Sequence, residues 1–429
     1  MGAHPKDRRQ GSSGITRREF LRRSAMAGIA LPSAAAILAA CGSDDGGTSS
    51  SEGDAGTTLE LARPDNPVTL PTEGNPAIDD GLEPEAGPLV IFGYADYIWK
   101  KVRNQFAEQF DTQVEYTVFD TADEMVEKVR SGAVEADLIV TVTPDNVGKL
   151  ATAKLIQPLN HSYLPNFDAN VVEAQKNPFW DQGRLFTMPY TIYTTGIAWR
   201  NDVITDDIAA MENPYEIHWD PKYSGQSHLL NGSRDPLCMA LLKNGIADIN
   251  TGDPQDLELI KQDLQAGVDQ VNWRFDHVDY TEITAGASWA VHQTWSGQCA
   301  YYQYYLPKGL DITAISYLWP PHGDAGKPGI LGSDHFTIPR TAKNPILAHE
   351  MINFMLDSDN AIENYSYEGC QPPITALDPD KIVADGLVPP HLKNIILTEE
   401  DINMGLQELE LEPAVNQQWQ AIALEVGSA

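Results

Sequence analysis

Strand and helix patterns take turns at the start of the globular part of the chain. Short apolar or alternating runs typical of strands occur at 89–94, 114–119 and 137–142. Helical spacing of apolar residues occurs between them, at 100–110, at 122–131 and in the segment opened by Pro144-Asp145-Asn146. Strands that are joined through helices pair in parallel with right-handed crossovers, so this order predicts an α/β fold.

Two further runs predict long strands that cross between two lobes. Residues 189–200 (PYTIYTTGIAWR) are rich in β-branched and aromatic side chains, and 336–339 is the candidate for the return strand. Helical periodicity resumes over 346–355. A chain of 429 residues has ample length for two or three domains.

The charge balance excludes one class of partner. The formal net charge is −32 at pH 7, and a surface this acidic repels the phosphates of nucleic acids. The same charge is compatible with a cationic ligand, but equally with solubility or a saline habitat.

Residues 1–40 have the pattern of a targeting segment. Arg17-Arg18 precedes an apolar stretch over 25–40, and Leu38-Ala39-Ala40-Cys41 follows. The pattern resembles a twin-arginine signal that ends in a bacterial lipobox, which implies cleavage before Cys41 and lipidation of its thiol. A short transmembrane anchor is the alternative, but a spanning helix needs about 20 apolar residues and Pro32 interrupts this shorter run.

Residues 41–88 predict a disordered tether behind the lipidated cysteine. The segment from 42 to 58 is composed of small and acidic residues, and 63–88 is rich in Pro and acidic residues. Such compositions bury too little apolar surface to offset the entropy of ordering. We therefore expect a flexible connection between lipid and folded domain.

The chain lacks the enzyme signatures that can be tested by pattern. It has no phosphate loop and no Gly-x-Gly-x-x-Gly, and the nearest approach to a nucleophile elbow, at 286–290, ends in Ala290. His349-Glu350 has no second His at the spacing of a zinc helix. Residues 248–259 begin like a calcium loop but lose its ligands, and Asp253 with Pro254 predicts a helix start instead. We expect no enzyme activity, no cofactor and no metal.

The cysteines beyond Cys41 are widely separated. Cys238, Cys299 and Cys370 are not clustered as metal ligands are, so burial as small apolar groups is the expectation. Export would permit one disulfide, and the sequence does not select a pair.

Aromatic residues at strand ends suggest how a cation is held. Trp295 stands in Thr294-Trp295-Ser296-Gly297-Gln298, where small neighbours leave its ring free to face a cleft. An aromatic face attracts an ammonium by about 0.5–2 kcal/mol and covers the methylenes between amines. A carboxylate at each end fixes the length of such a ligand.

The body, over most of 89–429, resembles the spermidine/putrescine-binding proteins of ABC importers. The resemblance is carried in order by the passages 92–106, 136–160, 188–204, 223–241, 295–298, 332–356 and 368–373. It implies a type II periplasmic-binding-protein fold of two α/β lobes with ligand between them. Lobe one would comprise 89–197 plus 336–429, and lobe two 198–335. A monomer that hands its ligand to a membrane permease is implied.

The resemblance also implies a set of ligand-binding residues. They are Tyr94, Asp96, Tyr97, Thr143, Asp145, Asp235, Trp295, Gln298 and Asp334. The chain departs from the family where Gly232 and Gln298 replace acids and where Asp145 replaces an aromatic residue. Because an unpaired buried ammonium costs several kcal/mol, these losses favour a cationic alkylamine with one strong charge, or with a guanidinium or carboxylate at one end.

Two other readings stay open on the sequence. One is a protein of the same fold for another solute, such as an iron complex, a thiamine-like cofactor or an amino-acid derivative. Iron would use paired tyrosines, for which Tyr301-Tyr302 and Tyr304-Tyr305 are weak candidates. The other is an exported hydrolase, which the missing nucleophile signature disfavours.

Overall fold

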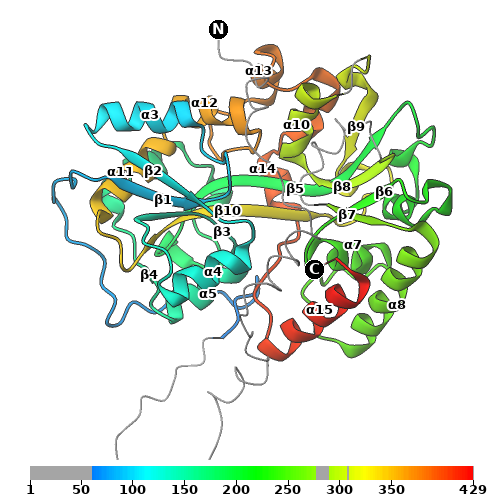
Figure 1. Ribbon diagram of the computed structural model, residues 1–429, viewed down its shortest axis with the longest axis horizontal. Helices are drawn as coiled ribbons and strands as arrows, with labels where there is room; N and C mark the ends of the chain where they lie inside the picture. The colour runs from blue at the N-terminus through cyan, green and yellow to red at the C-terminus, as the bar shows by residue number, and fades with distance from the viewer. Residues whose placement is uncertain (1–59, 277–288, 307–308, 429) are drawn as a thin grey trace, which may run out of the picture. The chain divides into compact units, whose positions relative to one another are not determined.

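One mixed β-sheet runs through the globular part of the protein. A computed structural model describes residues 60–276, 289–306 and 309–428, except the side chains of 303–305. Within these residues the strands follow the order β2-β1-β3-β10-β5-β8-β6-β7, with β4 beside β10 and β9 beside β5. Figure 1 shows β5 and β10 passing between the helices at the two ends of this sheet.

The strands are β1 (Leu89–Gly93), β2 (Val114–Val118), β3 (Leu138–Val142), β4 (Ile156–Gln157), β5 (Met188–Arg200), β6 (Ser227–Leu230), β7 (Arg274–Asp276), β8 (Val291–Trp295), β9 (Ile315–Leu318) and β10 (Ile330–Pro339). The α-helices are α3 (Lys100–Gln109), α4 (Ala122–Ser131), α5 (Pro144–Thr152), α6 (Pro165–Asn170), α7 (Asp235–Lys243), α8 (Pro254–Val271), α10 (Ser296–Tyr305), α11 (Pro345–Met355), α12 (Ser358–Glu368), α13 (Pro379–Ala384), α14 (Glu399–Met404) and α15 (Pro413–Val426).

The predicted alternation of strands and helices is confirmed. β1 pairs in parallel with both β2 and β3, and α3, α4 and α5 begin where the sequence predicts. The long strand β5 is confirmed, whereas β10 begins at Ile330 and is longer than the predicted return strand. Asp253 caps α8 and Pro254 opens it, which confirms the helix start predicted in place of a calcium loop.

Hydrophobic clusters lie on both sides of the crossing strands. In β1, Leu89 and Ile91 join one cluster with α3 and α11, and Phe92 joins a second cluster with α4 and α5. This alternation is that of a strand covered on both faces, as parallel sheets require. Beyond β5 a third cluster joins Leu229 and Val291 of β6 and β8 to α7 and α8.

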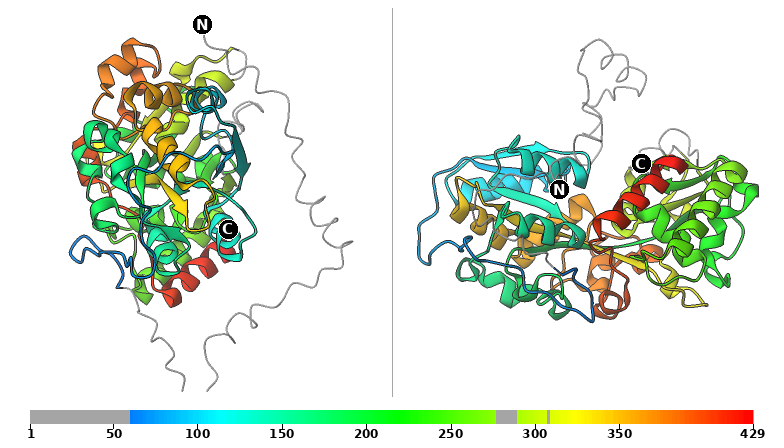
Figure 2. Two further views of the ribbon diagram at one scale, coloured as in Figure 1. Left: turned by 90° about the vertical axis from the view of Figure 1, so that its left-hand side faces the viewer. Right: turned by 90° about the horizontal axis from the view of Figure 1, so that it is seen from below.

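The C-terminal helix differs from the predicted division of lobes. The sequence assigns 336–429 to lobe one, but α15 packs against α8 in the cluster of lobe two, as Figures 1 and 2 show. Trp419, Ile422 and Val426 form its buried stripe. Amphipathic spacing reveals that a helix buries one face, but it does not reveal against which lobe, and this explains the difference.

The segment 60–88 also differs from the predicted tether, because it packs on the body. Val68 and Leu70 are buried in the cluster of α4 and α5, and the Val68 N–H donates to the Phe179 carbonyl at 2.8 Å. Asn75 Nδ2 donates to the Ile156 carbonyl at 2.8 Å. The overall composition of 60–88 is acidic and Pro-rich, and it does not reveal these few anchoring side chains. The predicted signal peptide, Cys41 and the tether up to residue 59 lie outside the described residues.

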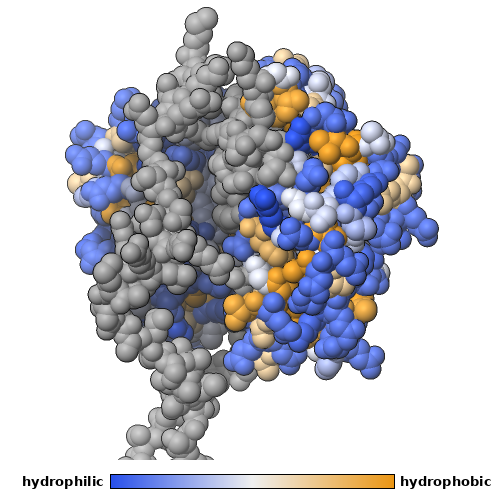
Figure 3. Space-filling view, turned by 45° about the vertical axis from the view of Figure 1, so that its right-hand side comes forward, coloured by the Kyte–Doolittle hydropathy of each residue, from blue (hydrophilic) through white to orange (hydrophobic). Residues whose placement is uncertain are grey.

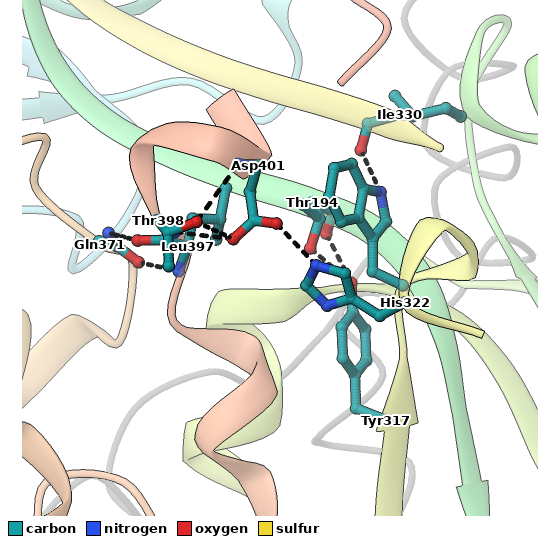
Figure 4. Close-up of polar contacts among 9 residues, drawn as sticks. Thr194, Tyr317, His322, Ile330, Gln371, Leu397, Thr398 and Asp401 are labelled. Carbon is teal, nitrogen blue, oxygen red and sulfur yellow. Dashed lines mark hydrogen bonds and ion pairs between the residues drawn. The ribbon is translucent and has the colours of Figure 1, made fainter. Parts of the chain in front are cut away.

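Polar contacts hold α14 to two other parts of the chain (Figure 4). The Gln371 side chain accepts from the Leu397 N–H at 2.7 Å and donates to the Leu397 carbonyl at 2.9 Å. Thr398 and Asp401 form a capping box at the start of α14, and Asp401 also bonds His322 Nε2 at 2.6 Å. The helix is therefore tied both to the segment after α12 and to the loop after β9.

One face of the described part of the protein is mainly polar where Figure 3 shows it. The face in Figure 3 is largely hydrophilic, with apolar groups interspersed. Among the described residues, no helix combines the length and apolar character needed to cross a bilayer.

The docking of α15 predicts unequal effects for two substitutions on one helix. Trp419 is fully buried, and its Nε1 donates to the Thr251 carbonyl at 3.1 Å, whereas Leu424 is 71% exposed. We expect Trp419→Ala to lower the free energy of unfolding by about 3–5 kcal/mol. Leu424→Ala should change it by less than about 0.5 kcal/mol. Urea unfolding followed by circular dichroism measures both, and equal effects would contradict the docking of α15.

Candidate functional site

Strand register gathers the predicted site residues into a row across the crossing strands. Thr191, Tyr193 and Thr195 alternate along β5 and therefore share one face of the sheet. Their register partners are Asp334 and Gly332 on β10, opposite Thr191 and Tyr193, and Trp295 on β8, opposite Thr195. We call Asp334, Tyr193, Trp295 and the adjoining Asp235 the acid–aromatic row.

Asp334 forms one end of the row and is 4% exposed. The Tyr97 hydroxyl donates to its Oδ2 at 2.5 Å, and Thr191 Oγ1 lies 3.5 Å from the same oxygen. Burial raises the pKa of Asp334 to about 6, although the two hydroxyls oppose the shift. Removal from water therefore outweighs these hydrogen bonds.

Irregular pairing surrounds Asp334. The register of β10 shifts between Asp334 and His335 on the β5 side, and between His335 and Phe336 on the β3 side. On β3, the β-branched Thr141 has a φ of +90°, a conformation that costs about 1–3 kcal/mol. Bulges re-aim side chains and are frequent beside functional sites, which agrees with the place of Asp334.

Tyr193 lies in the middle of the row, and the sequence analysis did not single it out. A Cβ on Gly332 would lie 2.1 Å from Tyr193 Cε2, so only glycine lets the ring lie across β10. The rings of Tyr193 and Trp295 have centroids 6.1 Å apart. Burial raises the pKa of Tyr193, and the charges of Asp334 and Asp235 raise it further, so this ring lies in the field of both acids. The sequence alone does not reveal that Tyr193 pairs with Gly332 of β10, because this depends on the strand register.

Asp235 forms the other end of the row, at the first position of α7. Thr195 Oγ1 donates to its Oδ1 at 3.2 Å, and the Trp295 side chain also hydrogen-bonds to the carboxylate. Burial nevertheless raises the pKa of Asp235 above its ordinary value. Like Asp334, this acid accepts hydrogen bonds from neutral donors and is partly removed from water, but the charge of Arg234 also opposes the rise of its pKa.

Glu408 is a second acid beside Asp235 that the sequence analysis missed. Its Oε1 is buried without a hydrogen-bond partner among the described residues. Burial and the nearby charge of Asp235 raise its pKa, while Arg234 opposes the shift. The two carboxylates are therefore close enough to repel each other. No pattern marks Glu408, because it lies in the irregular segment between α14 and α15.

A clamp of hydrogen bonds explains how Glu408 reaches lobe two. Asn250 donates to the Gln407 carbonyl at 2.9 Å and accepts from the Leu409 N–H at 2.8 Å. Arg234 donates to Asn250 Oδ1 at 2.6 Å and to the Leu409 carbonyl at 3.0 Å. These contacts fix the backbone on both sides of Glu408. Arg234 thus positions the segment as well as contributing positive charge.

Residues of lobe one complete the set. The Tyr94 ring lies 6.0 Å from that of Tyr97, and burial together with Asp334 and Asp145 raises the pKa of Tyr94. Thr143 Oγ1 donates to Asp145 Oδ1 at 2.5 Å. The charge of Asp145 also raises the pKa of Asp334, so Asp145 acts electrostatically on the Asp334 end of the row.

Two of the predicted residues stand apart. Asp96 is exposed in the turn after β1, and Gln298 lies nearly buried in the first turn of α10 with Oε1 lacking a partner in the described part of the chain. None of the contacts described for the resolved side chains joins either residue to the acid–aromatic row. Their roles stay predictions.

Other expectations for the aromatic and cysteine residues have mixed outcomes. Tyr301 and Tyr302 are buried, and Tyr302 packs against Trp289, so the structure does not favour this pair as an iron site. The side chains of Tyr304 and Tyr305 lie outside the described residues. Cys238 and Cys299 lie buried in separate apolar clusters, which confirms the predicted burial for these two.

The family follows from comparison with known proteins. A family model for bacterial extracellular solute-binding proteins matches residues 101–390. The chain belongs to this family. Its members bind solutes, and the match includes every part of the acid–aromatic row.

Several similar solute-binding proteins carry polyamine names. The spermidine/putrescine-binding periplasmic protein of Escherichia coli is 25% identical over 273 residues, which cover 64% of this chain and 74% of that protein. The putrescine/cadaverine-binding protein of Pseudomonas aeruginosa is 25% identical over 357 residues, which cover 79% and 94%.

Solved structures show the same fold for this solute-binding protein. The substrate-binding protein PotD of Streptococcus pneumoniae aligns with a TM-score of 0.63 at 24% identity, covering 79% of this chain and 98% of that one. The Tp0655 lipoprotein of Treponema pallidum aligns with a TM-score of 0.65 at 20% identity, with the same coverage. The fold is therefore the type II periplasmic-binding-protein fold that the sequence predicts.

The short hydrogen bond to Asp334 predicts a shift in its titration. Tyr97→Phe removes the donor that opposes protonation, so the pKa of Asp334 should rise above 6 by about 1–2 units. Because the folded pKa already exceeds the unfolded value of about 3.9, stability falls as pH rises from about 4 to 6. In Tyr97→Phe this fall should extend to higher pH.

Carbon-13 NMR of labelled aspartate, with Asp334→Asn to assign the resonance, measures this pKa. Thr191→Val is the matched control, since its longer contact predicts a smaller rise. A pKa that is unchanged in Tyr97→Phe would contradict the role given to the hydroxyl.

Proposed function

We propose that the protein is an extracytoplasmic binding protein that captures a diamine or a related cationic alkylamine and delivers it to an ABC permease. The acid–aromatic row carries the proposal. It offers carboxylates at Asp334 and Asp235 with the rings of Tyr193 and Trp295 between them. The names of the relatives support the same class of ligand.

The chemistry of the row suits an alkylamine. An ammonium at each end would compensate a buried carboxylate, and desolvated charge pairs of this kind are strongly specific. The rings would cover the methylenes and add about 0.5–2 kcal/mol where they face an ammonium. Burial raises the pKa of both carboxyl groups, and an ammonium beside either one would favour its ionised form.

Glu408 supports a ligand with two positive ends. The family acids replaced by Gly232 and Gln298 suggested a ligand with one strong charge. Glu408 supplies a carboxylate beside Asp235 from a segment outside the motifs that carry the resemblance. A cation between the two acids would relieve their repulsion, so the losses at 232 and 298 are compensated at that end.

The remaining predicted contacts belong to the same proposal. Tyr94, Tyr97, Thr143 and Asp145 would line the lobe-one side, and Asp96 and Gln298 would join only after the lobes move. Lobe one comprises 89–197 with the chain from 336 through α14, and lobe two comprises 198–335 with α15. Closure of the lobes around the ligand would create the surface that the permease recognises.

Amine binding depends on the acids at both ends. We expect the full chain to bind putrescine, cadaverine, spermidine or agmatine in calorimetric titrations. Asp334→Asn, Asp235→Asn and Glu408→Gln should each weaken the best ligand roughly 100-fold or more, because loss of one partner leaves an ammonium unpaired. Glu410→Gln, two residues from Glu408, should change the affinity by less than about threefold.

The outcomes separate the parts of this proposal. Absence of heat with these amines and with basic amino acids would reject the ligand class. If Glu408→Gln and Glu410→Gln bind the amine with equal affinity, Glu408 is not part of the site, although the proposal of amine binding is retained.

We also propose that Cys41 carries lipid and holds the protein on the outer face of the cell membrane. Two acyl chains give stable anchoring where one does not. Expressed in a bacterial host, the chain should incorporate labelled palmitate and sediment with membranes. Cys41→Ser should do neither, whereas Cys370→Ser should behave as the parent. Palmitate incorporation that persists in Cys41→Ser would contradict the assignment.

A further inference from the structure

Lobe two contains a cluster of two histidines and one aspartate that the proposed amine site does not use. His228 on β6 and His292 on β8 are register partners in parallel strands, and Asp276 ends β7 on the other side of β6. His292 is three residues from Trp295 on β8, so alternation turns it to the opposite face of the sheet. The cluster is therefore separate from the acid–aromatic row.

The potential ligand atoms of the cluster converge. One atom from each of His228, Asp276 and His292 lies within 4.8 Å of the other two. Asp276 Oδ2 lies 2.5 Å from His228 Nδ1 and 3.9 Å from His292 Nε2. A tetrahedral Zn²⁺ with bonds of about 2.0–2.2 Å spaces its ligand atoms about 3.3–3.5 Å apart, so small side-chain rotations would create that geometry.

The hydrogen bonding of His292 prepares its ring for a cation. Its Nδ1 contacts the Gln293 carbonyl, which only accepts, and so the proton of the neutral ring belongs on Nδ1. Nε2 then presents a lone pair towards the Asp276 carboxylate. A backbone carbonyl that orients the other ring nitrogen is the usual outer partner of a metal-ligating histidine.

Burial and access also suit a metal. The side chains of both histidines are fully buried, whereas that of Asp276 is 22% exposed. The three ligands stand on neighbouring strands, which hold their positions more firmly than loops do. The exposed edge of Asp276 gives an ion a way in.

We propose that His228, Asp276 and His292 form a binding site for Zn²⁺ or a similar borderline transition-metal ion. Two imidazoles and one carboxylate are ligands that Zn²⁺ prefers, whereas Ca²⁺ and Mg²⁺ require oxygen ligands. Three protein ligands leave one coordination position open. The ion would tie β6, β7 and β8 together and stabilise lobe two without touching the amine.

The experiment uses the full chain without an affinity tag, after removal of metals with a chelator. Titration with Zn²⁺ should show one ion bound per chain and a rise in the unfolding temperature, because an ion that binds only the folded state stabilises it. Co²⁺ should give the intense visible absorption of four-coordinate cobalt, which Zn²⁺ should abolish by displacement.

Variants test the assignment of the ligands. His292→Gln and Asp276→Asn should each lose the stoichiometric binding of Zn²⁺, while His349→Gln, at a buried histidine of lobe one, should retain it. Absence of Zn²⁺ uptake and of a Co²⁺ spectrum in the parent would overturn the site, as would equal uptake in the His292 and His349 variants. The Co²⁺ spectrum of the parent remains decisive where a variant fails to fold.

Putrescine titration of the metal-free parent keeps the two proposals distinguishable. Unchanged amine affinity with and without Zn²⁺ is expected from their places on opposite faces of β8. A strict requirement of amine binding for Zn²⁺ would contradict the separation of the two sites.

Discussion

The antiparallel pairing of β5 with β10 positions the rest of the site. This pairing places Asp334 opposite Thr191 and Gly332 opposite Tyr193, and the next pairing places Trp295 opposite Thr195. A shift of one residue would turn each of these side chains to the other face of the sheet. Asp235 follows β6, so the pairings of β5 with β8 and of β8 with β6 also contribute to the spacing between the two acids.

Burying the two acids of the acid–aromatic row costs the protein free energy when no cation is bound. The neutral hydroxyls of Tyr97 and Thr191 contact the Asp334 carboxylate, but burial still raises its pKa to about 6. Neutral donors orient a carboxylate but do not replace the water it has lost. A binding protein gains from this arrangement, because a bound cation relieves a penalty that was already present before it arrived.

Sequence patterns predicted the fold well where local spacing decides it. The parallel start from β1 to α5, the long β5 and the cap of α8 follow from periodicity and capping residues that neighbours in sequence determine. Tyr97, Asp235, Trp295 and Asp334 were predicted through motifs, and contacts join them to one row. Glu408 and the partner lobe of α15 were not predicted, because only the tertiary path of the chain brings them there.

The C-terminal segment shows why a site cannot be carried over by motif alone. Glu408 reaches Asp235 because Asn250 and Arg234 clamp the backbone of Gln407 and Leu409 from lobe two. Trp419 packs under the same Arg234, whose guanidinium lies 4.8 Å from the ring centroid. The side chain that packs on α15 thus also helps to fix the backbone beside Glu408. Arg234 and Asn250 therefore link the C-terminal segment, α15 and the start of α7 through direct contacts.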